Sequence, residues 1–193
     1  CIGILGANGC GKSTLLSILA RVQACDQGSF LCDGVDLLKN AKEHARLVGY
    51  VPQGTPLIDE LSARDNLLLW YDRKTMEQEL EDGVLSLLGI SEFLGVTVSK
   101  MSGGMKKRLS IGCAMASNPP VLLLDEPTAA LDLACKQSIA AYLRHYKEKG
   151  GILLLTTHDV MELELCDVWY IIRDGVLVPF DYDGNVQKLV ESL

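Results

Sequence analysis

The segment from Gly6 to Ser13 reads GANGCGKS and fits the phosphate-loop pattern G-x-x-x-x-G-K-[ST]. Glycines at these positions let successive backbone N–H groups point inward around phosphate oxygens at the start of a helix. Lys12 brings a positive charge to the β- and γ-phosphates, and the Ser13 hydroxyl is a ligand type that suits Mg²⁺. We predict a nucleotide phosphate site, with a structural glycine turn as the alternative, and we expect Lys12 to be exposed and to pack against nothing. The residues predicted to contact the nucleotide are Gly6, Asn8, Gly9, Cys10, Gly11, Lys12, Ser13 and Thr14.

Two carboxylates follow a continuous apolar run. The run at residues 121–124 is typical of a strand that is buried on both faces of a parallel sheet, and Asp125 and Glu126 come directly after it. Ligands of open α/β sheets bind at the carboxyl ends of the strands. We expect Asp125 to hold Mg²⁺, commonly through water, and Glu126 to orient an attacking water or accept its proton. A solvated strand end is the alternative for this pair taken alone.

Three further segments carry weaker signals. Ser102-Gly103-Gly104 opens a predicted helix, where free amides and the helix dipole favour a γ-phosphate, although serine and glycine are also an ordinary helix start. His158 follows another predicted strand and could reach the terminal phosphate, although a lone histidine in a loop is usually structural. Gln53 follows a third predicted strand, and a neutral amide there can both ligate Mg²⁺ and bond a water.

Apolar patterning predicts the elements that must position these motifs. The predicted strands cover residues 1–5, 47–51, 121–124, 151–157, 168–173 and 176–178. The predicted helices cover residues 13–20, 63–71, 75–88, 103–116, 134–149, 160–166 and 185–193. Asp33-Gly34 predicts a hairpin within residues 28–38, and Asp174-Gly175 predicts a tight turn.

Alternating strands and helices predict an α/β fold with a mainly parallel sheet. The helices at residues 58–117 interrupt this alternation, and we expect them to form an inserted α-helical subdomain. Residues 1–57 and 118–193 would then form the core that contains the sheet. One domain is thus expected in all.

Composition narrows the possible functions. The net charge of −7, from 18 basic and 25 acidic residues, argues against non-specific binding to nucleic acid. The basic run Lys106-Lys107-Arg108 is interpreted as a solvated helix face. No apolar stretch approaches the roughly 18 residues that span a bilayer. Seven cysteines without a C-x-x-C pair favour reduced thiols over a metal site or a disulfide framework.

Taken together and in this order, the motifs resemble those of ATP-binding cassette (ABC) domains over nearly the whole chain. The motifs are the Walker A loop 6–14, Gln53 as the Q-loop, the signature 101–105, the Walker B stretch 121–126, the D-loop 130–132 and His158 as the switch histidine. The resemblance implies a P-loop NTPase with a RecA-like core, and ATP and Mg²⁺ as cofactors. The catalytic residues that it implies are Glu126, His158 and Gln53, and the Mg²⁺ ligands are Ser13, Gln53 and Asp125.

The same resemblance implies a head-to-tail pair of domains with two ATP molecules between them. Ser102, Gly103 and Gly104 of one subunit would cap the phosphate that Lys12 of the other holds, and Asp132 would lie at that interface. The partners expected are therefore a second nucleotide-binding domain and separate transmembrane permease subunits. The helical insertion, with the surface near Gln53, would receive the cytoplasmic helices of the permease subunits. The protein would then be cytoplasmic and peripheral on the inner face of the cell membrane.

Some positions depart from the family pattern. The signature has Met101 where leucine is common and Met105 where glutamine is common, and Met105 followed by basic residues resembles exporters of the multidrug type. Family members stack adenine on an aromatic residue upstream of the Walker A strand, but Cys1 stands five residues before Gly6. We therefore expect the N-terminal antiparallel β-subdomain to be largely missing.

The leading interpretation is an ATPase subunit whose nucleotide-driven dimerisation moves transmembrane subunits. A soluble ABC ATPase that does not take part in transport and a regulatory ATP-binding cassette are the alternatives. A P-loop kinase or a GTPase is disfavoured, because a base-reading Asn-Lys-x-Asp is absent and neither class needs Ser102-Gly103-Gly104 beside His158.

Overall fold

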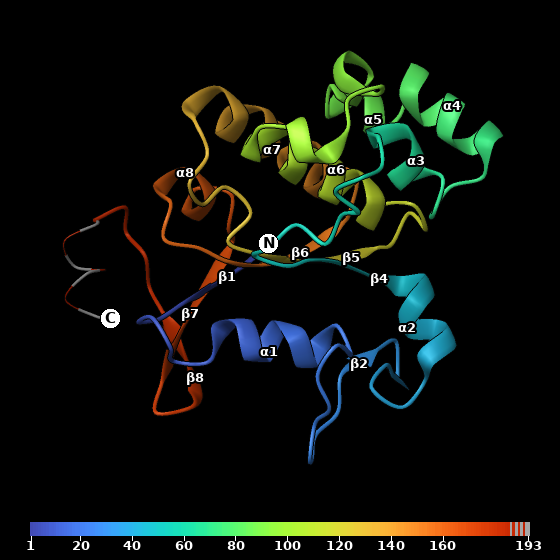
Figure 1. Ribbon diagram of the computed structural model, residues 1–193. Helices are drawn as coiled ribbons and strands as arrows, with labels where there is room; N and C mark the ends of the chain where they lie inside the picture. The colour runs from blue at the N-terminus through green and yellow to red at the C-terminus, as the bar shows by residue number, and fades with distance from the viewer. Residues whose placement is uncertain (186, 188, 190, 192–193) are drawn as a thin grey trace.

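Strands of the described chain form a six-stranded sheet and a separate two-stranded ribbon. The structure is a computed structural model that describes residues 1–185, 187, 189 and 191. The order in the large sheet is β4-β5-β6-β1-β7-β8, and all neighbours are parallel except β7 and β8 (Figure 1). Its strands are β1 (Ile2–Leu5), β4 (Val48–Val51), β5 (Val121–Asp125), β6 (Ile152–Thr156), β7 (Val168–Arg173) and β8 (Val176–Phe180). The predicted α/β fold with a mainly parallel sheet is confirmed.

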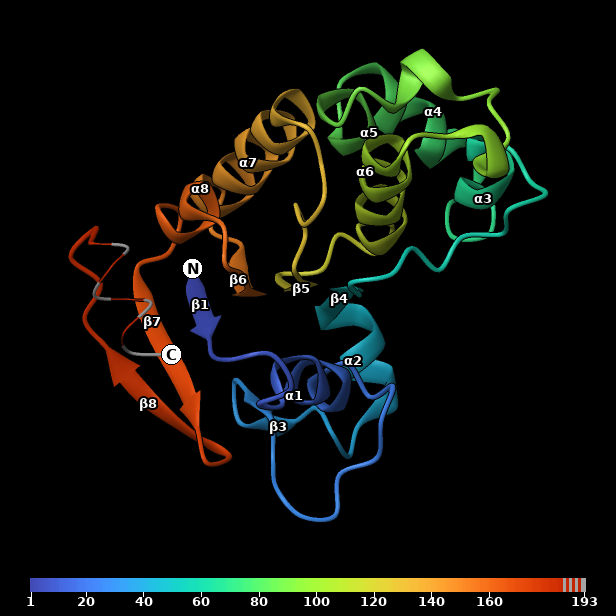
Figure 2. The same cartoon turned by 60° about the vertical axis from the view of Figure 1, so that its left-hand side comes forward.

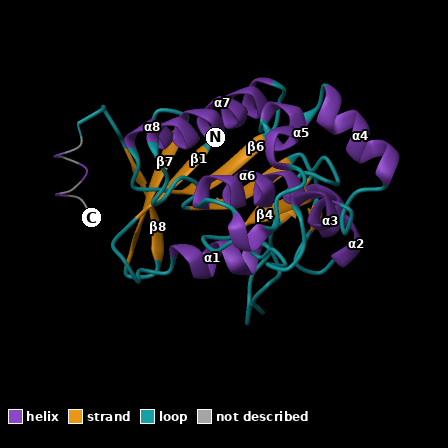
Figure 3. Ribbon diagram, turned by 45° about the horizontal axis from the view of Figure 1, so that its top comes forward, coloured by secondary structure: helices purple, strands orange, loops and turns teal. Residues whose placement is uncertain are grey.

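Helices cover both faces of this sheet (Figure 3). The strand β5 shows the reason, because all five of its residues are buried. Val121 and Leu123 belong to the apolar cluster beside α1, whereas Leu122 and Leu124 belong to the larger core that α6 and α7 complete. The helices are α1 (Lys12–Leu19), α2 (Ala41–Leu47), α3 (Ala63–Leu67), α4 (Arg73–Glu81), α5 (Val84–Leu87), α6 (Gly103–Ala114), α7 (Leu133–Glu148) and α8 (Val160–Leu163), with 3₁₀ turns η1 (Ile90–Phe93) and η2 (Val98–Lys100).

Both predicted hairpin turns are present. Asp174 and Gly175 have φ values of 49° and 77°, as a two-residue type I′ turn requires, and they join β7 to the antiparallel edge strand β8 (Figure 2). Asp33 and Gly34 do the same between β2 (Leu31–Cys32) and β3 (Val35–Asp36).

The helices α3 to α6 lie on the same side of the sheet as α7, and α6 packs against β4 (Figures 1 and 2). The apolar residues of this helical segment belong to the same core cluster as the inner residues of β5 and β6. Within the segment, the buried Tyr71 hydroxyl donates a hydrogen bond to the Gly112 carbonyl at 2.8 Å and so fixes the chain after α3 against α6. The insertion of a helical segment is confirmed, and its status as a separate subdomain stays a prediction.

Two expectations for local structure fail. The helix predicted over residues 75–88 is two helices, because the Glu79 carboxylate accepts the Val84 N–H at 2.7 Å and occupies the space where a side chain on Gly83 would stand. The helix α2 was not predicted, although the Asn40 side chain caps it by accepting the Glu43 N–H.

The predicted helix at residues 185–193 includes residues 186, 188, 190, 192 and 193, which lie outside the described residues. Across the described chain, no helix combines the length and the apolar character needed to cross a membrane.

Candidate nucleotide-binding site

The loop between β1 and α1 has the backbone geometry that its glycines predict. Gly6 and Gly11 have φ values of 151° and 107°, in the region that favours glycine. A Cβ on Gly6 would also lie 2.5 Å from the Cys10 sulfur, so a side chain at this position would require Cys10 to move. Gly11 is the N-cap of α1 and carries no side-chain cap, which leaves the N–H groups of the first turn facing the loop. The loop therefore presents an anion-binding helix start.

The side chain of Lys12 is buried, with 6% of its surface exposed. Its ammonium donates hydrogen bonds to the carbonyls of Gly6 at 2.6 Å and Ala7 at 3.1 Å. The expectation that Lys12 is exposed and packs against nothing was wrong, because the loop curls around the ammonium group and supplies it with acceptors. This fixes the position of the charge at the centre of the loop.

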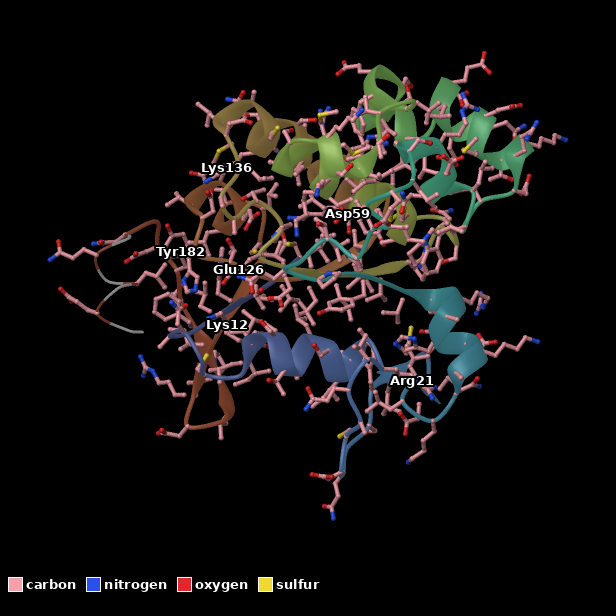
Figure 4. All side chains as sticks on the ribbon, in the orientation of Figure 1. Lys12, Arg21, Asp59, Glu126, Lys136 and Tyr182 are labelled. Atoms are coloured by element: carbon pink, nitrogen blue, oxygen red, sulfur yellow. The ribbon has the colours of Figure 1, made fainter. Side chains whose placement is uncertain are left out.

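A pocket of about 390 Å³ opens over this loop. Gln53, after β4, and Glu126, after β5, reach its wall from neighbouring parallel strands. Figure 4 shows Lys12 at the start of α1 and Glu126 beyond β5. The residues that line the pocket are Asn8, Gly9, Gly11, Lys12, Ser13, Thr14, Gln53 and Glu126.

Thr156 at the end of β6 binds the Asp125 carboxylate and the Glu126 backbone. Its hydroxyl donates a hydrogen bond to the buried Asp125 carboxylate at 2.6 Å, and its carbonyl and hydroxyl both accept the Glu126 N–H at 3.1 Å. These bonds hold Glu126 at a φ of 45°, a conformation that costs a non-glycine residue roughly 1–3 kcal/mol. Glu126 lines the pocket over the phosphate loop. Thr156 was not among the predicted site residues, although Thr156 stands two residues before His158.

Gln53 and His158 flank the Glu126 carboxylate. The Gln53 amide donates a hydrogen bond to one oxygen at 3.0 Å, and the other oxygen lies 3.9 Å from the His158 Nε2. Burial is the main cause that lowers the pKa of His158, the charge of Lys12 lowers it further, and Glu126 acts in the opposite direction. A neutral imidazole at pH 7 follows, which can exchange a proton beside a carboxylate.

The signature segment lies elsewhere. Ser102 caps α6, where its hydroxyl accepts the Met105 N–H at 3.2 Å. Asp132 caps α7 in the same way, and hydrogen bonds from the N–H and the thiol of Cys135 lower the pKa of Asp132. Gly104 is buried against α7, since a Cβ on it would lie 2.2 Å from the Cys135 sulfur. Neither Ser102 nor Asp132 lines the pocket over Lys12.

The basic run on α6 was misread in one place. Lys106 and Arg108 are partly exposed, but the side chain of Lys107 is buried, with 4% of its surface exposed. Its ammonium group contacts the loop of Gln53. The interpretation of this run as a solvated helix face was therefore wrong for Lys107.

A family model described as ABC transporter matches residues 1–129. The chain belongs to the ABC transporter family. The chain is 33% identical to the Nod factor export ATP-binding protein I of Rhizobium etli, covering 100% of this chain and 62% of that protein. It is 35% identical to the molybdenum import ATP-binding protein ModC of Rhizobium johnstonii, covering 89% of this chain and 51% of that protein. The chain thus spans between half and two thirds of the length of these relatives.

Solved structures give the same result for the fold. The cassette resembles the dimeric post-hydrolysis structure of the ATP-binding cassette MJ0796 bound to ADP and Pi, with a TM-score of 0.77 and 26% identity, over 94% of this chain and 85% of that one. A nucleotide-free ATP-binding cassette of an ABC transporter has a TM-score of 0.85 at 21% identity, over 98% and 83% of the two chains, which shows the shared fold. The family predicted from the motifs is confirmed.

Proposed function

We propose that this cassette binds Mg-ATP and hydrolyses it to ADP and phosphate between two copies of the chain, as the energy-supplying subunit of a membrane transporter. The observation that carries the proposal is the convergence of Lys12, Gln53 and Glu126 on one pocket, with His158 beside Glu126. These residues come from the loops after β1, β4, β5 and β6, which are parallel neighbours in the sheet. Ligands of open α/β sheets bind at the carboxyl ends of such strands.

The residues divide the reaction between binding and proton transfer. The loop amides and the Lys12 ammonium bind the β- and γ-phosphates. Glu126 accepts the proton of the attacking water as the new P–O bond forms, and the bond from the γ-phosphorus to the bridging oxygen breaks to release ADP. The Gln53 amide positions the Glu126 carboxylate through their hydrogen bond, and the neutral His158 can hold a proton at the leaving phosphate.

The residues assigned to Mg²⁺ have the hard oxygen donors that this ion requires. Ser13 lines the pocket. The Gln53 amide donates an N–H to Glu126, so the Gln53 amide oxygen is left as an acceptor. Asp125 is 3% exposed and receives a hydrogen bond from Thr156, a setting in which it would hold the ion through water. Bound Mg²⁺ would neutralise charge on the transferring phosphoryl group.

A second cassette is required to complete this site. Ser102 and Gly103 are exposed at the start of α6, and Leu133 beside Asp132 is a large apolar residue with 64% of its surface exposed. A head-to-tail partner would cover this surface and bring the α6 start to the phosphate held by Lys12. The dimeric structures of the MJ0796 cassette support a pair of cassettes.

An apolar groove supports the transport role. It has a volume of about 760 Å³ and lies between β4 and α6, with Trp70 67% exposed and Val22 72% exposed at its edges. Tyr50 and Pro52, directly before Gln53, form part of its wall. An amphipathic helix of a transmembrane subunit would bury these side chains. Because that helix would contact Tyr50 and Pro52, a movement of the Gln53 loop would change its position. The cassette would then lie on the inner face of the membrane.

The direction of transport is proposed to be export. The signature with Met105 supports export, and the relatives include the Nod factor exporter of Rhizobium etli. Relatives named for molybdenum and methionine import have similar identities, so the main support for export is the signature.

The experiment that tests this function is phosphate release from Mg-ATP at increasing protein concentration, with light scattering on the same samples. Because the site needs two chains, we expect the rate per chain to rise with concentration and to follow the dimer fraction. A rate per chain that is the same in samples of monomer would contradict the shared site. No phosphate release by the dimer would contradict the ATPase proposal.

A further inference from the structure

Lys107 is a buried cation on α6, one turn beyond the signature segment. Its ammonium donates hydrogen bonds to two consecutive backbone carbonyls, those of Pro52 and Gln53, both at 2.9 Å. The neighbouring Lys106 instead pairs with Asp59 at 3.3 Å on the surface. Lys107 therefore joins α6 to the loop that follows β4.

Burying an ammonium group has a large cost, so such a group is retained where its hydrogen bonds and charge neighbours compensate for it. Burial is the main cause that lowers the pKa of Lys107, and the negative charges of Asp125, Glu162 and Glu126 act against this. The cation thus lies within the field of the carboxylates at the end of β5 and of Glu162 in α8. An apolar residue would fill the same space without that cost, so that packing alone does not explain a lysine here.

The loop that Lys107 holds is also the loop that contacts the catalytic carboxylate. The Gln53 backbone carbonyl accepts the Lys107 bond, and the Gln53 side chain donates to Glu126 at 3.0 Å. Gln53 itself is exposed, so few other contacts restrict its side chain. One unbroken series of hydrogen bonds therefore leads from α6 through Gln53 to Glu126.

We propose that Lys107 is a positioning residue that ties α6 to the loop after β4 and thereby holds the Gln53 amide against Glu126. A movement of α6, which begins at the signature segment, would then be transmitted to the Glu126 carboxylate of the same chain. The proposal rests on the proposed ATPase function for its kinetic consequences and on geometry alone for its effect on the loop.

The variant Lys107→Met fills the same space but cannot donate a hydrogen bond. We expect kcat for ATP hydrolysis to fall about 10- to 100-fold, as for a displaced catalytic group, while KM for ATP changes little. Lys107→Arg can donate to both carbonyls and should restore most of kcat. Lys106→Met is the matched control, because it removes a charge from the adjacent position and should leave kcat unchanged. A Lys107→Met enzyme with parental kcat would overturn the proposal.

A double-mutant cycle with Gln53→Ala separates this role from a general loss of packing. If Lys107 acts through Gln53, adding Lys107→Met to Gln53→Ala should cause no further loss of kcat. Losses that multiply would show that Lys107 acts by another route and would overturn the proposal.

Amide hydrogen exchange tests the contact without any need for turnover. We expect exchange at residues 53–57 to be several-fold faster in Lys107→Met and unchanged in Lys106→Met, since opening of the loop no longer breaks two hydrogen bonds. Unchanged exchange in both variants would overturn the proposal. If the parent protein shows no ATPase activity but the exchange result is obtained, the proposed function fails and the positioning role of Lys107 stands.

Discussion

The pocket around Lys12 and the surface around Ser102 carry complementary parts of the proposed ATP site, and they differ in the exposure of their polar groups. In the pocket, Lys12, Asp125 and Glu126 all have partners supplied by the chain itself. On the surface, Ser102 and Asp132 cap helices, and the residues around them are exposed. One chain thus preorganises the groups of the pocket, and in the proposed dimer a second chain would supply the Ser102 surface.

This difference separates two kinds of effect in mutational experiments. A change in the pocket should alter nucleotide binding or the chemical step in each chain. A change on the Ser102 surface should leave the binding of nucleotide to a monomer intact. It should affect only dimerisation and the ATP hydrolysis that depends on the dimer.

The largest effect is expected for Glu126→Gln. Glutamine is nearly isosteric and can still contact Gln53, but it cannot accept a proton, so ATP turnover should fall about 10²- to 10⁴-fold with little change in ATP affinity. Because slow hydrolysis lets the ATP-bound closed state accumulate, light scattering with Mg-ATP should report a dimer for this variant. The exposed Glu164→Gln is the matched control for charge. Parental turnover in Glu126→Gln would show that Glu126 is not the catalytic carboxylate.

Lys12→Ala should have the next largest effect. Loss of charge-assisted contacts to the phosphates costs about 1.5–3 kcal/mol, or roughly 10- to 100-fold in ATP affinity. Because the ammonium also satisfies the Gly6 and Ala7 carbonyls, we expect a lower thermal midpoint as well. Calorimetry with ATP and a thermal melt measure the two effects. Lys39→Ala, at an exposed position, should change neither.

Unchanged ATP affinity in Lys12→Ala would show that Lys12 does not bind the phosphates of ATP in this pocket. Unchanged stability together with weaker binding would instead show that the two carbonyl contacts of the ammonium do not contribute to folding.

Gly104→Ala tests the surface side of the comparison. A Cβ at this position meets the Cys135 sulfur at 2.2 Å, whereas a Cβ on Gly103 finds its nearest neighbour, in Leu131, at 3.6 Å. We expect Gly104→Ala to cost about 1–3 kcal/mol in the free energy of unfolding, as overpacked sites do, and Gly103→Ala to cost much less. Adding Cys135→Ala should restore stability. ATP affinity of the monomer should stay at the parental value in all three proteins, and a loss of it would show that the two regions are not separable.

The sequence predicted the pocket better than the contacts that hold it. Glycine spacing and the strand before Asp125 predict the loop and the carboxylates because those features are local. The burial of Lys107 depends on carbonyls 54 and 55 residues away, and no local pattern contains that information. Lys12 is buried by the carbonyls of its own loop, whose curvature around the ammonium group the glycine spacing does not specify. The break at Gly83 was likewise not predicted, because the N–H of Val84 at the start of α5 is bonded by the Glu79 side chain instead of by a backbone carbonyl.

The smallest effect, and the most direct measure of the electrostatics of the pocket, is the titration of His158. Burial and the charge of Lys12 lower its pKa, so the NMR midpoint should lie below the ordinary value of 6.5. The unfolded chain then binds this proton more readily, so the contribution of His158 to stability is present above pH 6.5 and is lost as the pH falls through the folded pKa. Lys12→Ala should raise the midpoint and Glu126→Gln should lower it, because the first removes a repelling charge and the second an attracting one. Gly104→Ala should leave it unchanged, and a midpoint that responds to Gly104→Ala but not to Lys12→Ala would contradict the place of His158 beside Glu126 and Lys12.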